Sequence, residues 1–180
     1  MKKLSILFVT TLLISACTSP TQVTAPGFVT SCDQIRLLES ADKSALMGCL
    51  DGSGEIYFYQ LKGPLLINVW GSWCEGCKQE MPYFVELYQN PLFKNGQIQM
   101  LGVNVEEKSK EDAIDYIQKS GMSWPNLEDT SGISKSIFGP GVPVTWFIDE
   151  NGKNIETKIG AYTNKKQLFN QVEKAFGVKL

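Results

Sequence analysis

Two cysteines with two residues between them, Cys74 and Cys77, carry the strongest chemical signal in this sequence. On the first turn of a helix, this spacing lets the two sulfurs form a disulfide that can open without moving the fold. A thiolate at a helix N-terminus is favoured by the helix dipole and by unpaired backbone N–H groups, so Cys74 is expected to be the exposed, attacking cysteine. Cys77, one turn further in, is expected to be more buried and to resolve the mixed disulfide. The alternative is a structural disulfide that happens to span four residues.

The other cysteines are Cys17, Cys32 and Cys49. Cysteines outside the cytoplasm are expected to pair. A disulfide between Cys32 and Cys49 would close a loop and stabilise the fold by about 3 kcal/mol, and we predict that this pair is structural. A resolving or relay role for the pair, or two free buried thiols, remain as alternatives. A zinc site that also uses Cys74 and Cys77 is disfavoured, because it would have one Cys-x2-Cys knuckle and no histidine.

The composition excludes several classes of function. The 180 residues contain no histidine, which excludes Ser-His-Asp and Cys-His catalysis and histidine-ligated metals. Seventeen basic against 19 acidic residues give a net charge of -2, so nucleic-acid binding is disfavoured. With 43% apolar and 20% charged residues, the chain suits one domain with a tail. We expect that the protein needs no metal and no organic cofactor.

The N-terminus has the pattern of a secretory signal. Two lysines precede an apolar run over residues 4–14, which falls short of the ~20 residues that a membrane-spanning helix needs, so a retained transmembrane span is the disfavoured alternative. The run Ile14-Ser15-Ala16-Cys17 resembles the bacterial lipobox, so we predict cleavage of residues 1–16 and lipidation of Cys17. The alternative is ordinary signal cleavage after residue 16 or residue 25, with Cys17 lost or left as a spare thiol. Both alternatives place the folded part outside the cytoplasm.

The predicted cleavage divides the chain into a signal peptide, a tether and a domain. Residues 17–30 are polar and uncharged, which suits a flexible tether behind the lipid anchor. Residues 31–180 are expected to form the folded domain. Without residues 1–16 the chain has 15 basic and 19 acidic residues, a net charge of -4 that opposes electrostatic binding to anionic lipid.

The hydrophobic pattern along the folded part alternates between strands and helices. Residues 65–70 are a short, mostly apolar run, typical of a strand that is buried on both faces. From Glu75 the spacing becomes helical, and Pro82 predicts a kink in that helix. This alternation predicts an α/β fold with a partly parallel sheet. The other predicted elements are a helix over 31–40, a hairpin of strands 45–50 and 55–61, a strand over 98–105, a helix over 109–120, a hairpin of strands 142–149 and 154–160, and a closing helix over 165–176 capped by Asn164.

The residues around the cysteine pair resemble the thioredoxin superfamily. The run Asn68–Trp73 leads directly into Cys74-Glu75-Gly76-Cys77, and Lys78-Gln79-Glu80-Met81-Pro82 follows. The chain is similar in particular to the extracytoplasmic thiol-disulfide oxidoreductases of the TlpA, ResA and DsbE type. The resemblance covers about residues 45–180 and implies a thioredoxin-like fold, in which helices flank a central mixed sheet. It also implies an N-terminal β-hairpin extension and a central helical insertion near residues 109–120.

The resemblance implies further site residues. Pro143, in Gly141-Val142-Pro143-Val144-Thr145, is expected to be the cis-proline that packs against the active-site disulfide, with a trans, purely structural proline as the alternative. Val142 and Pro143 would then contact the partner chain, together with Trp73, Glu75 and Gly76 of the motif. Trp73 has a packing role as its alternative.

Thioredoxin itself has a buried aspartate where this chain has Asn68, so proton transfer is expected to need another acid. Glu80 lies three residues after Cys77 on the same helix face, and we predict that it is buried beside that sulfur and exchanges a proton with it. The alternative is a solvated helix glutamate. Glu75 is expected to be exposed, and its negative charge disfavours the neighbouring thiolate, which favours a reducing site.

These features predict a thiol-disulfide oxidoreductase, lipid-anchored to a bacterial membrane, that exchanges its Cys74–Cys77 disulfide with cysteine pairs of extracytoplasmic proteins. The motif glutamates favour a reductase, as in ResA-like proteins that keep apocytochrome c or similar thiols reduced, while an oxidase of secreted proteins is the alternative direction. A membrane or extracytoplasmic thiol-disulfide protein would be the electron partner, and the chain is expected to be a monomer. An alternative of another class is a metallochaperone that clamps Cu(I) between the two thiolates. Peroxidase chemistry is disfavoured, because the sequence lacks a lone peroxidatic cysteine in a Pro-Thr-rich loop.

Overall fold

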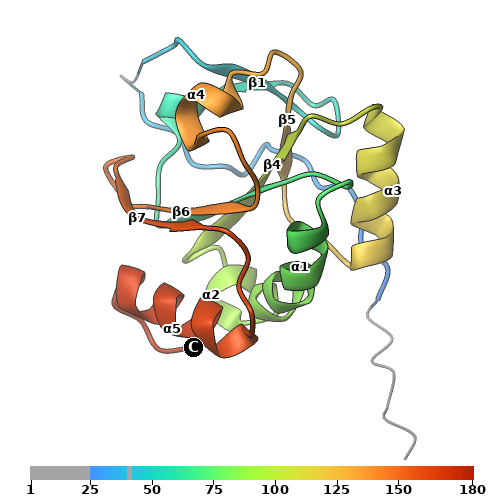
Figure 1. Ribbon diagram of the computed structural model, residues 1–180. Coiled ribbons are helices and arrows are strands. Elements are labelled where there is room, and N and C mark those ends of the chain that lie inside the picture. The colour runs from blue at the N-terminus through green and yellow to red at the C-terminus, as the bar shows by residue number, and fades with distance from the viewer. Residues whose placement is uncertain (1–24, 40–41) are drawn as a thin grey trace, which may run out of the picture.

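The computed structural model describes residues 25–39 and 42–180, so the predicted signal peptide, Cys17 and most of the tether lie outside the described residues. Within the described part, a mixed seven-stranded sheet forms the centre and helices cover its faces (Figure 1). The strands are β1 (Leu46–Cys49), β2 (Glu55–Tyr57), β3 (Leu65–Trp70), β4 (Gln99–Val105), β5 (Asn126–Asp129), β6 (Val144–Ile148) and β7 (Asn154–Ile159). The helices are α1 (Glu75–Tyr88), α2 (Pro91–Lys94), α3 (Lys110–Ser120), α4 (Ser134–Phe138) and α5 (Lys165–Phe176).

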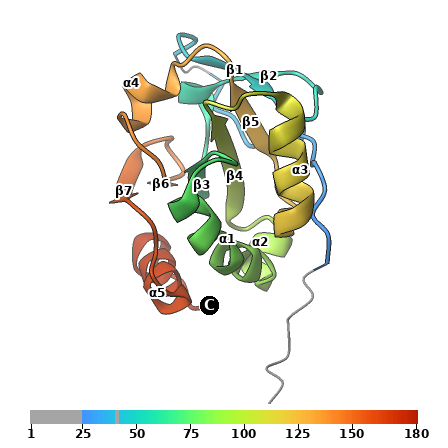
Figure 2. The ribbon, with the colours of Figure 1, turned by 45° about the vertical axis from the view of Figure 1, so that its right-hand side comes forward.

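The strand order is β2-β1-β5-β4-β3-β6-β7, which places β3 and β4 inside the sheet (Figure 2). β3, β4 and β5 run parallel to one another, and β6 and β7 continue the sheet antiparallel. Parallel neighbours need crossover connections, and here α1 with α2 joins β3 to β4, and α3 joins β4 to β5. The predicted α/β fold with a partly parallel central sheet is confirmed.

Strand β3 leads into the cysteine motif and is buried along its whole length. Leu66 and Trp70 pack into the hydrophobic cluster that contains residues of α1, α3 and α5. Leu65 and Ile67 pack into a second cluster on the opposite face of the sheet, to which α4 contributes. Successive side chains of a strand point to opposite faces, so Asn68 shares the face of Leu66 and Trp70. A polar side chain therefore faces α1 from the middle of the sheet.

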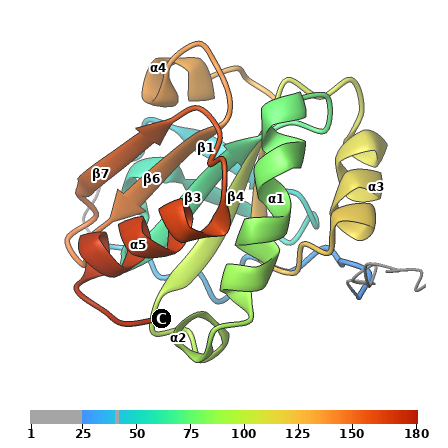
Figure 3. The ribbon, with the colours of Figure 1, turned by 60° about the horizontal axis from the view of Figure 1, so that its bottom comes forward.

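Helices α1 and α5 lie side by side over one face of the sheet, and α4 lies beyond its opposite face (Figure 3). Local signals define the ends of these helices. Ser109 caps α3 by accepting a hydrogen bond from the N–H of Asp112, and Asn164 caps α5 in the same way from Gln167. Gly121, with a φ of 85°, ends α3. The helices predicted over 109–120 and 165–176 are confirmed.

The prediction of a helix over residues 31–40 is wrong. Residues 31–39 contain no helix, and residue 40 lies outside the described part. The backbone N–H of Arg36 donates to the side chain of Gln99, and the N–H of Leu38 donates to a carbonyl oxygen of the 3-10 turn over Phe58–Gln60. This segment thus satisfies its backbone groups through neighbouring segments rather than through its own turns.

The predicted hairpin around residues 51–54 is present as the antiparallel pair β1 and β2. Its second strand ends at Tyr57 instead of residue 61, because the 3-10 turn follows directly. The sequence analysis missed α2, β5 and α4, which are only four or five residues long. A helix of four or five residues makes little more than one turn, so it shows no helical period.

The folded domain begins earlier than the boundary predicted at residue 31. The N–H of Gly27 donates to the carbonyl oxygen of Gln118, and the N–H of Phe28 donates to that of Met122, each at 2.9 Å. A Cβ at Gly27 would lie 2.1 Å from the carbonyl oxygen of Ile117, so only glycine permits this approach to the end of α3. The last residues of the predicted tether are therefore part of the domain.

Candidate active site

Cys74 and Cys77 form a disulfide at the N-terminus of α1. Cys74 is the N-cap residue, and its Sγ accepts a hydrogen bond from the backbone N–H of Cys77 at 3.1 Å. The Cys74 sulfur thus lies at the positive end of the helix dipole. Cys74 is 5% exposed and Cys77 is 0% exposed. Cys74 is the more accessible cysteine, but in the disulfide form it is far less open than the sequence suggested, because it packs into the hydrophobic cluster around α1.

The loop before β6 packs against the cysteine motif. The Val142–Pro143 peptide bond is cis, as predicted. A Cβ added to Gly76 would lie 3.3 Å from Cδ of Pro143 and 3.5 Å from Cβ of Ala161. The missing side chain of Gly76 therefore lets the proline loop and the loop after β7 approach the motif. The structure brings together three segments that lie far apart in the sequence.

Trp73, immediately before the disulfide, is 48% exposed. Its indole N–H donates to the carbonyl oxygen of Val105 at 3.3 Å, and the ring lies over Gly71, where a Cβ would come within 2.5 Å of Nε1. The ring is thus fixed by the fold and still presents surface to solvent. Glu75 is exposed and Val142 is partly exposed, so both also keep surface beside the disulfide.

The sequence analysis did not single out Glu107, which fixes the loop before the disulfide. Its Oε1 accepts hydrogen bonds from the backbone N–H of Ser72 and from Nδ2 of Asn104, and its Oε2 accepts one from the Ser72 hydroxyl at 2.7 Å. The side chain therefore ties the end of β3 to the end of β4. A glutamate beside a charged, solvated helix start carries no sequence signal for this role.

Glu80 is buried on α1, one turn after Cys77, with 0% of its surface exposed. Its Oε1 accepts a hydrogen bond from Nδ2 of Asn68 at 3.1 Å, and its Oε2 accepts one from the backbone N–H of Tyr162 at 2.8 Å. The alternative of a solvated helix glutamate is therefore wrong. The sequence could not identify Tyr162, because a backbone donor leaves no trace in side-chain type.

Burial raises the pKa of the Glu80 carboxyl from 4.5 to about 7. The hydrogen bonds from Tyr162 and Asn68 act in the opposite direction, as does the positive charge of Lys158, because all of them stabilise the carboxylate. A group with a pKa near neutrality can both accept and donate a proton at neutral pH. The site thus combines a disulfide with a buried carboxyl group on the same helix.

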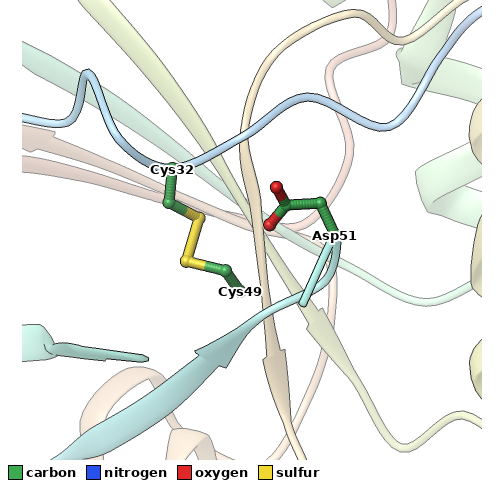
Figure 4. A group of neighbouring side chains, drawn as sticks. All are labelled: Cys32, Cys49 and Asp51. Atoms are coloured by element: carbon green, nitrogen blue, oxygen red, sulfur yellow. A yellow bond between two sulfur atoms is a disulfide. The ribbon is translucent and has the colours of Figure 1, made fainter. Parts of the chain in front are cut away.

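A second disulfide joins Cys32 to Cys49 and ties the N-terminal segment to β1 (Figure 4). The Asp51 carboxylate lies beside it, and one ligand atom of each of these residues falls within 4.8 Å of the others. A metal would need the cysteines as thiolates, and the disulfide leaves none. β1 lies three strands from β3 in the sheet, a lateral separation of about 14 Å, so the two disulfides belong to separate regions.

Comparison with known proteins agrees with this geometry. Residues 41–156 match the AhpC/TSA family. The chain belongs to the AhpC/TSA family. Within this family it is similar to the thiol-disulfide oxidoreductase ResA of Bacillus cereus, with 30% identity over 178 residues that cover 97% of this chain and 98% of the relative. ResA of Geobacillus thermodenitrificans is 34% identical over 108 residues, which cover 59% of this chain and 60% of that protein.

This member of the AhpC/TSA family is a thiol-disulfide oxidoreductase, since the Bacillus cereus relative that carries that name is matched over nearly its full length. A secreted disulfide oxidoreductase of Mycobacterium tuberculosis, homologous to E. coli DsbE, has a TM-score of 0.61 at 18% identity, over 72% of this chain and 94% of that one. This likeness confirms the thioredoxin-like fold implied by the sequence. In the part of the chain that the structure describes, no helix has the length and apolar character needed to cross a membrane.

Proposed function

We propose that this protein reduces disulfides of other extracytoplasmic proteins through Cys74 and Cys77. The observation that carries the proposal is a disulfide at the N-terminus of α1 with the buried carboxyl group of Glu80 one turn further along the same helix. The exposed charge of Glu75, between the two cysteines, supports the reducing direction. It disfavours the neighbouring thiolate and so favours the disulfide form of this protein over its own dithiol.

The exchange proceeds from the reduced form of the protein. The Cys74 thiolate attacks one sulfur of the partner disulfide, a mixed disulfide forms, and the other partner sulfur leaves as a thiolate. Glu80 takes the proton of the Cys77 thiol, and the Cys77 thiolate then attacks the Cys74 sulfur. The second partner sulfur leaves, so the partner has gained two electrons and the Cys74–Cys77 disulfide is restored. The partner thiolates take up protons from Glu80 and from solvent.

The partner chain docks on the surface around the disulfide. About half of Trp73, immediately before the disulfide, is open to solvent, and Val142, next to the buried Pro143, is partly exposed. Gly76 has no side chain, which lets Pro143 and Ala161 approach the motif. A dithiol of a membrane or extracytoplasmic protein returns the electrons by the same exchange in reverse.

The sequence supports a lipid anchor at Cys17, which lies outside the described residues. The run Ile14-Ser15-Ala16-Cys17 after an apolar segment has the lipobox pattern. Mass spectrometry of the purified protein checks this proposal, with diacylation of an N-terminal Cys17 as the expected result. Cys17→Ser should release the protein from the membrane fraction, and an unmodified Cys17 within an uncleaved chain would contradict the anchor.

The reduction potential of the Cys74–Cys77 pair tests the direction of electron flow. The purified full chain is equilibrated in glutathione and dithiothreitol buffers, with Cys74→Ser as the control. A potential near that of thioredoxin, about -270 mV, supports a reductase. A potential above about -150 mV, toward the -120 mV of strong oxidants, would show an oxidase instead. A pair that does not titrate would be a structural disulfide.

A further inference from the structure

Lys158, near the end of β7, has an unusual set of contacts. Its Nζ donates hydrogen bonds to the carbonyl oxygens of Ile159 at 2.7 Å, Gly160 at 2.9 Å and Ala161 at 3.5 Å. Among the residues that the structure describes, no carboxylate oxygen lies within 4.0 Å of this ammonium group. The side chain is partly buried. Its charge is therefore directed at the backbone of the loop over residues 159–161.

The peptide group between Ala161 and Tyr162 lies between Lys158 and Glu80. Its carbonyl oxygen accepts the hydrogen bond from Lys158, and its N–H donates to Oε2 of Glu80 at 2.8 Å. The C=O and N–H of a trans peptide group point in opposite directions. The dipole of this peptide group therefore has an ammonium group at its oxygen end and a carboxylate at its N–H end. The charge of Lys158 strengthens the hydrogen bond to Glu80, and the charge of Glu80 strengthens the hydrogen bond from Lys158.

The peptide group between Ile159 and Gly160 repeats this arrangement toward the proline loop. Its carbonyl oxygen accepts the 2.7 Å hydrogen bond from Lys158, and its N–H donates to the carbonyl oxygen of Pro143 at 2.9 Å. The same loop also places Ala161 against Gly76 of the motif. Lys158 therefore binds the outer side of a loop whose inner side contacts the cysteine helix, the proline loop and the buried carboxyl group.

We propose that Lys158 is a positioning residue for thiol-disulfide exchange, which orients and polarises the loop over residues 159–162 so that its N–H groups bind Glu80 and Pro143. The inference rests on the proposed role of Glu80. By strengthening the bond from Tyr162, Lys158 favours the ionised form of Glu80, the form that takes the proton of Cys77. Without Lys158, a larger fraction of Glu80 would stay protonated at neutral pH and the resolving step would slow.

Few other titratable groups face this carboxyl group. Tyr116 of α3 and Tyr162 itself have pKa values raised by burial and stay neutral around pH 7. Cys77 lies on α1 and is the proposed proton donor. Glu156, on the same face of β7 as Lys158, accepts a hydrogen bond from Gln171. Lys158 is the cation whose charge acts on Glu80.

Three variants and one control test the inference in the reduced full chain. Lys158→Met removes the charge and the donors, Lys158→Gln keeps N–H donors without charge, and Lys158→Arg keeps both. Lys153→Met removes an exposed lysine at the far end of the same hairpin. The readouts are the rate of reduction of oxidised glutathione as a function of pH, and the titration of the Tyr162 amide signal in the NMR spectrum of ¹⁵N-tyrosine-labelled protein.

For Lys158→Met we expect about tenfold slower reduction at pH 7, the loss that corresponds to one charge-assisted hydrogen bond. The titration midpoint of the Tyr162 amide should move to higher pH in Lys158→Met and Lys158→Gln, return toward the native value in Lys158→Arg, and stay unchanged in Lys153→Met. An unmoved midpoint in both uncharged variants overturns the inference, as does a Lys158→Arg variant as impaired as Lys158→Met.

Glu80→Gln separates this inference from the proposal on which it rests. If the Tyr162 titration disappears in Glu80→Gln but does not move in the Lys158 variants, only the role of Lys158 is wrong. If the titration persists in Glu80→Gln, the proposed proton transfer by Glu80 is wrong. Circular dichroism shows whether each variant is folded, and Lys158→Gln, which keeps polar contacts to the loop, carries the test if Lys158→Met does not fold.

Discussion

Asn68 on β3 donates a hydrogen bond of 3.1 Å from Nδ2 to Oε1 of Glu80, although both side chains are fully buried. The other end of the amide, Oδ1, has no hydrogen-bond partner within the described part of the chain. In one orientation, the NH2 group of the amide donates a hydrogen bond to a carboxylate. In the other orientation, the amide oxygen accepts a hydrogen bond from the O–H of a carboxylic acid. Asn68 can therefore serve Glu80 in both of its protonation states.

The raised pKa of Glu80 makes the stability of the fold depend on pH. Because this pKa rises from 4.5 to about 7 on folding, the folded chain binds more protons than the unfolded chain between these values. Binding of this proton stabilises the folded chain by about 3 kcal/mol. The stabilisation is fully present below about pH 4.5 and is lost as the pH rises through about 7. Urea unfolding at pH 5 and pH 8 measures this loss. Glu80→Gln should lack it, and equal pH dependence in both proteins would contradict the prediction.

Asn68→Asp should move the pH dependence of exchange to higher pH. Two carboxyl groups in one buried site do not ionise together readily, so they share a proton and Glu80 stays protonated to higher pH. The free energy of unfolding at pH 8 should fall by about 2–4 kcal/mol, because the site then holds two charges or binds an extra proton. Rate profiles against pH and urea unfolding measure both effects. The prediction fails if the midpoint of the rate profile is unchanged.

Glu107→Ala should loosen the loop before the disulfide. The substitution leaves the N–H and hydroxyl of Ser72 and the amide of Asn104 without their acceptor. The loss of such partly buried hydrogen bonds costs about 1–3 kcal/mol of unfolding free energy, and exchange should slow because the loop carries Trp73 and Cys74. Glu106→Ala is the matched control, since it removes only an exposed ion pair with Lys135 and should cost less than about 1 kcal/mol. Equal losses in the two variants would argue against the role of Glu107.

A double substitution, Cys32→Ser with Cys49→Ser, tests whether the second disulfide is structural. Loss of this cross-link should lower the free energy of unfolding by about 3 kcal/mol. The reduction potential of the Cys74–Cys77 pair should stay the same, because β1 and β3 lie three strands apart. Urea unfolding and a redox titration measure the two quantities. A changed potential, or slower re-reduction by an electron partner, would show that the pair acts as a relay.

The sequence by itself determined the features that depend on local physics. Three patterns of neighbouring residues predicted their elements correctly: the Cys74–Cys77 spacing, the buried run of β3 and the cap at Asn164. The exposure of Cys74 was misjudged, because the burial of a helix N-terminus depends on what packs over it.

Only the tertiary structure decided which groups complete the site. Glu80 meets Tyr162 across 82 positions of sequence, and Gly76 meets Ala161. Such contacts follow from the order of the strands, which sets β6 beside β3 and β7 beside β6, and no local pattern records them. Lys158 is the clearest case, because an alternating edge strand looks the same whether its lysine points to solvent or binds the backbone of a loop at the active site.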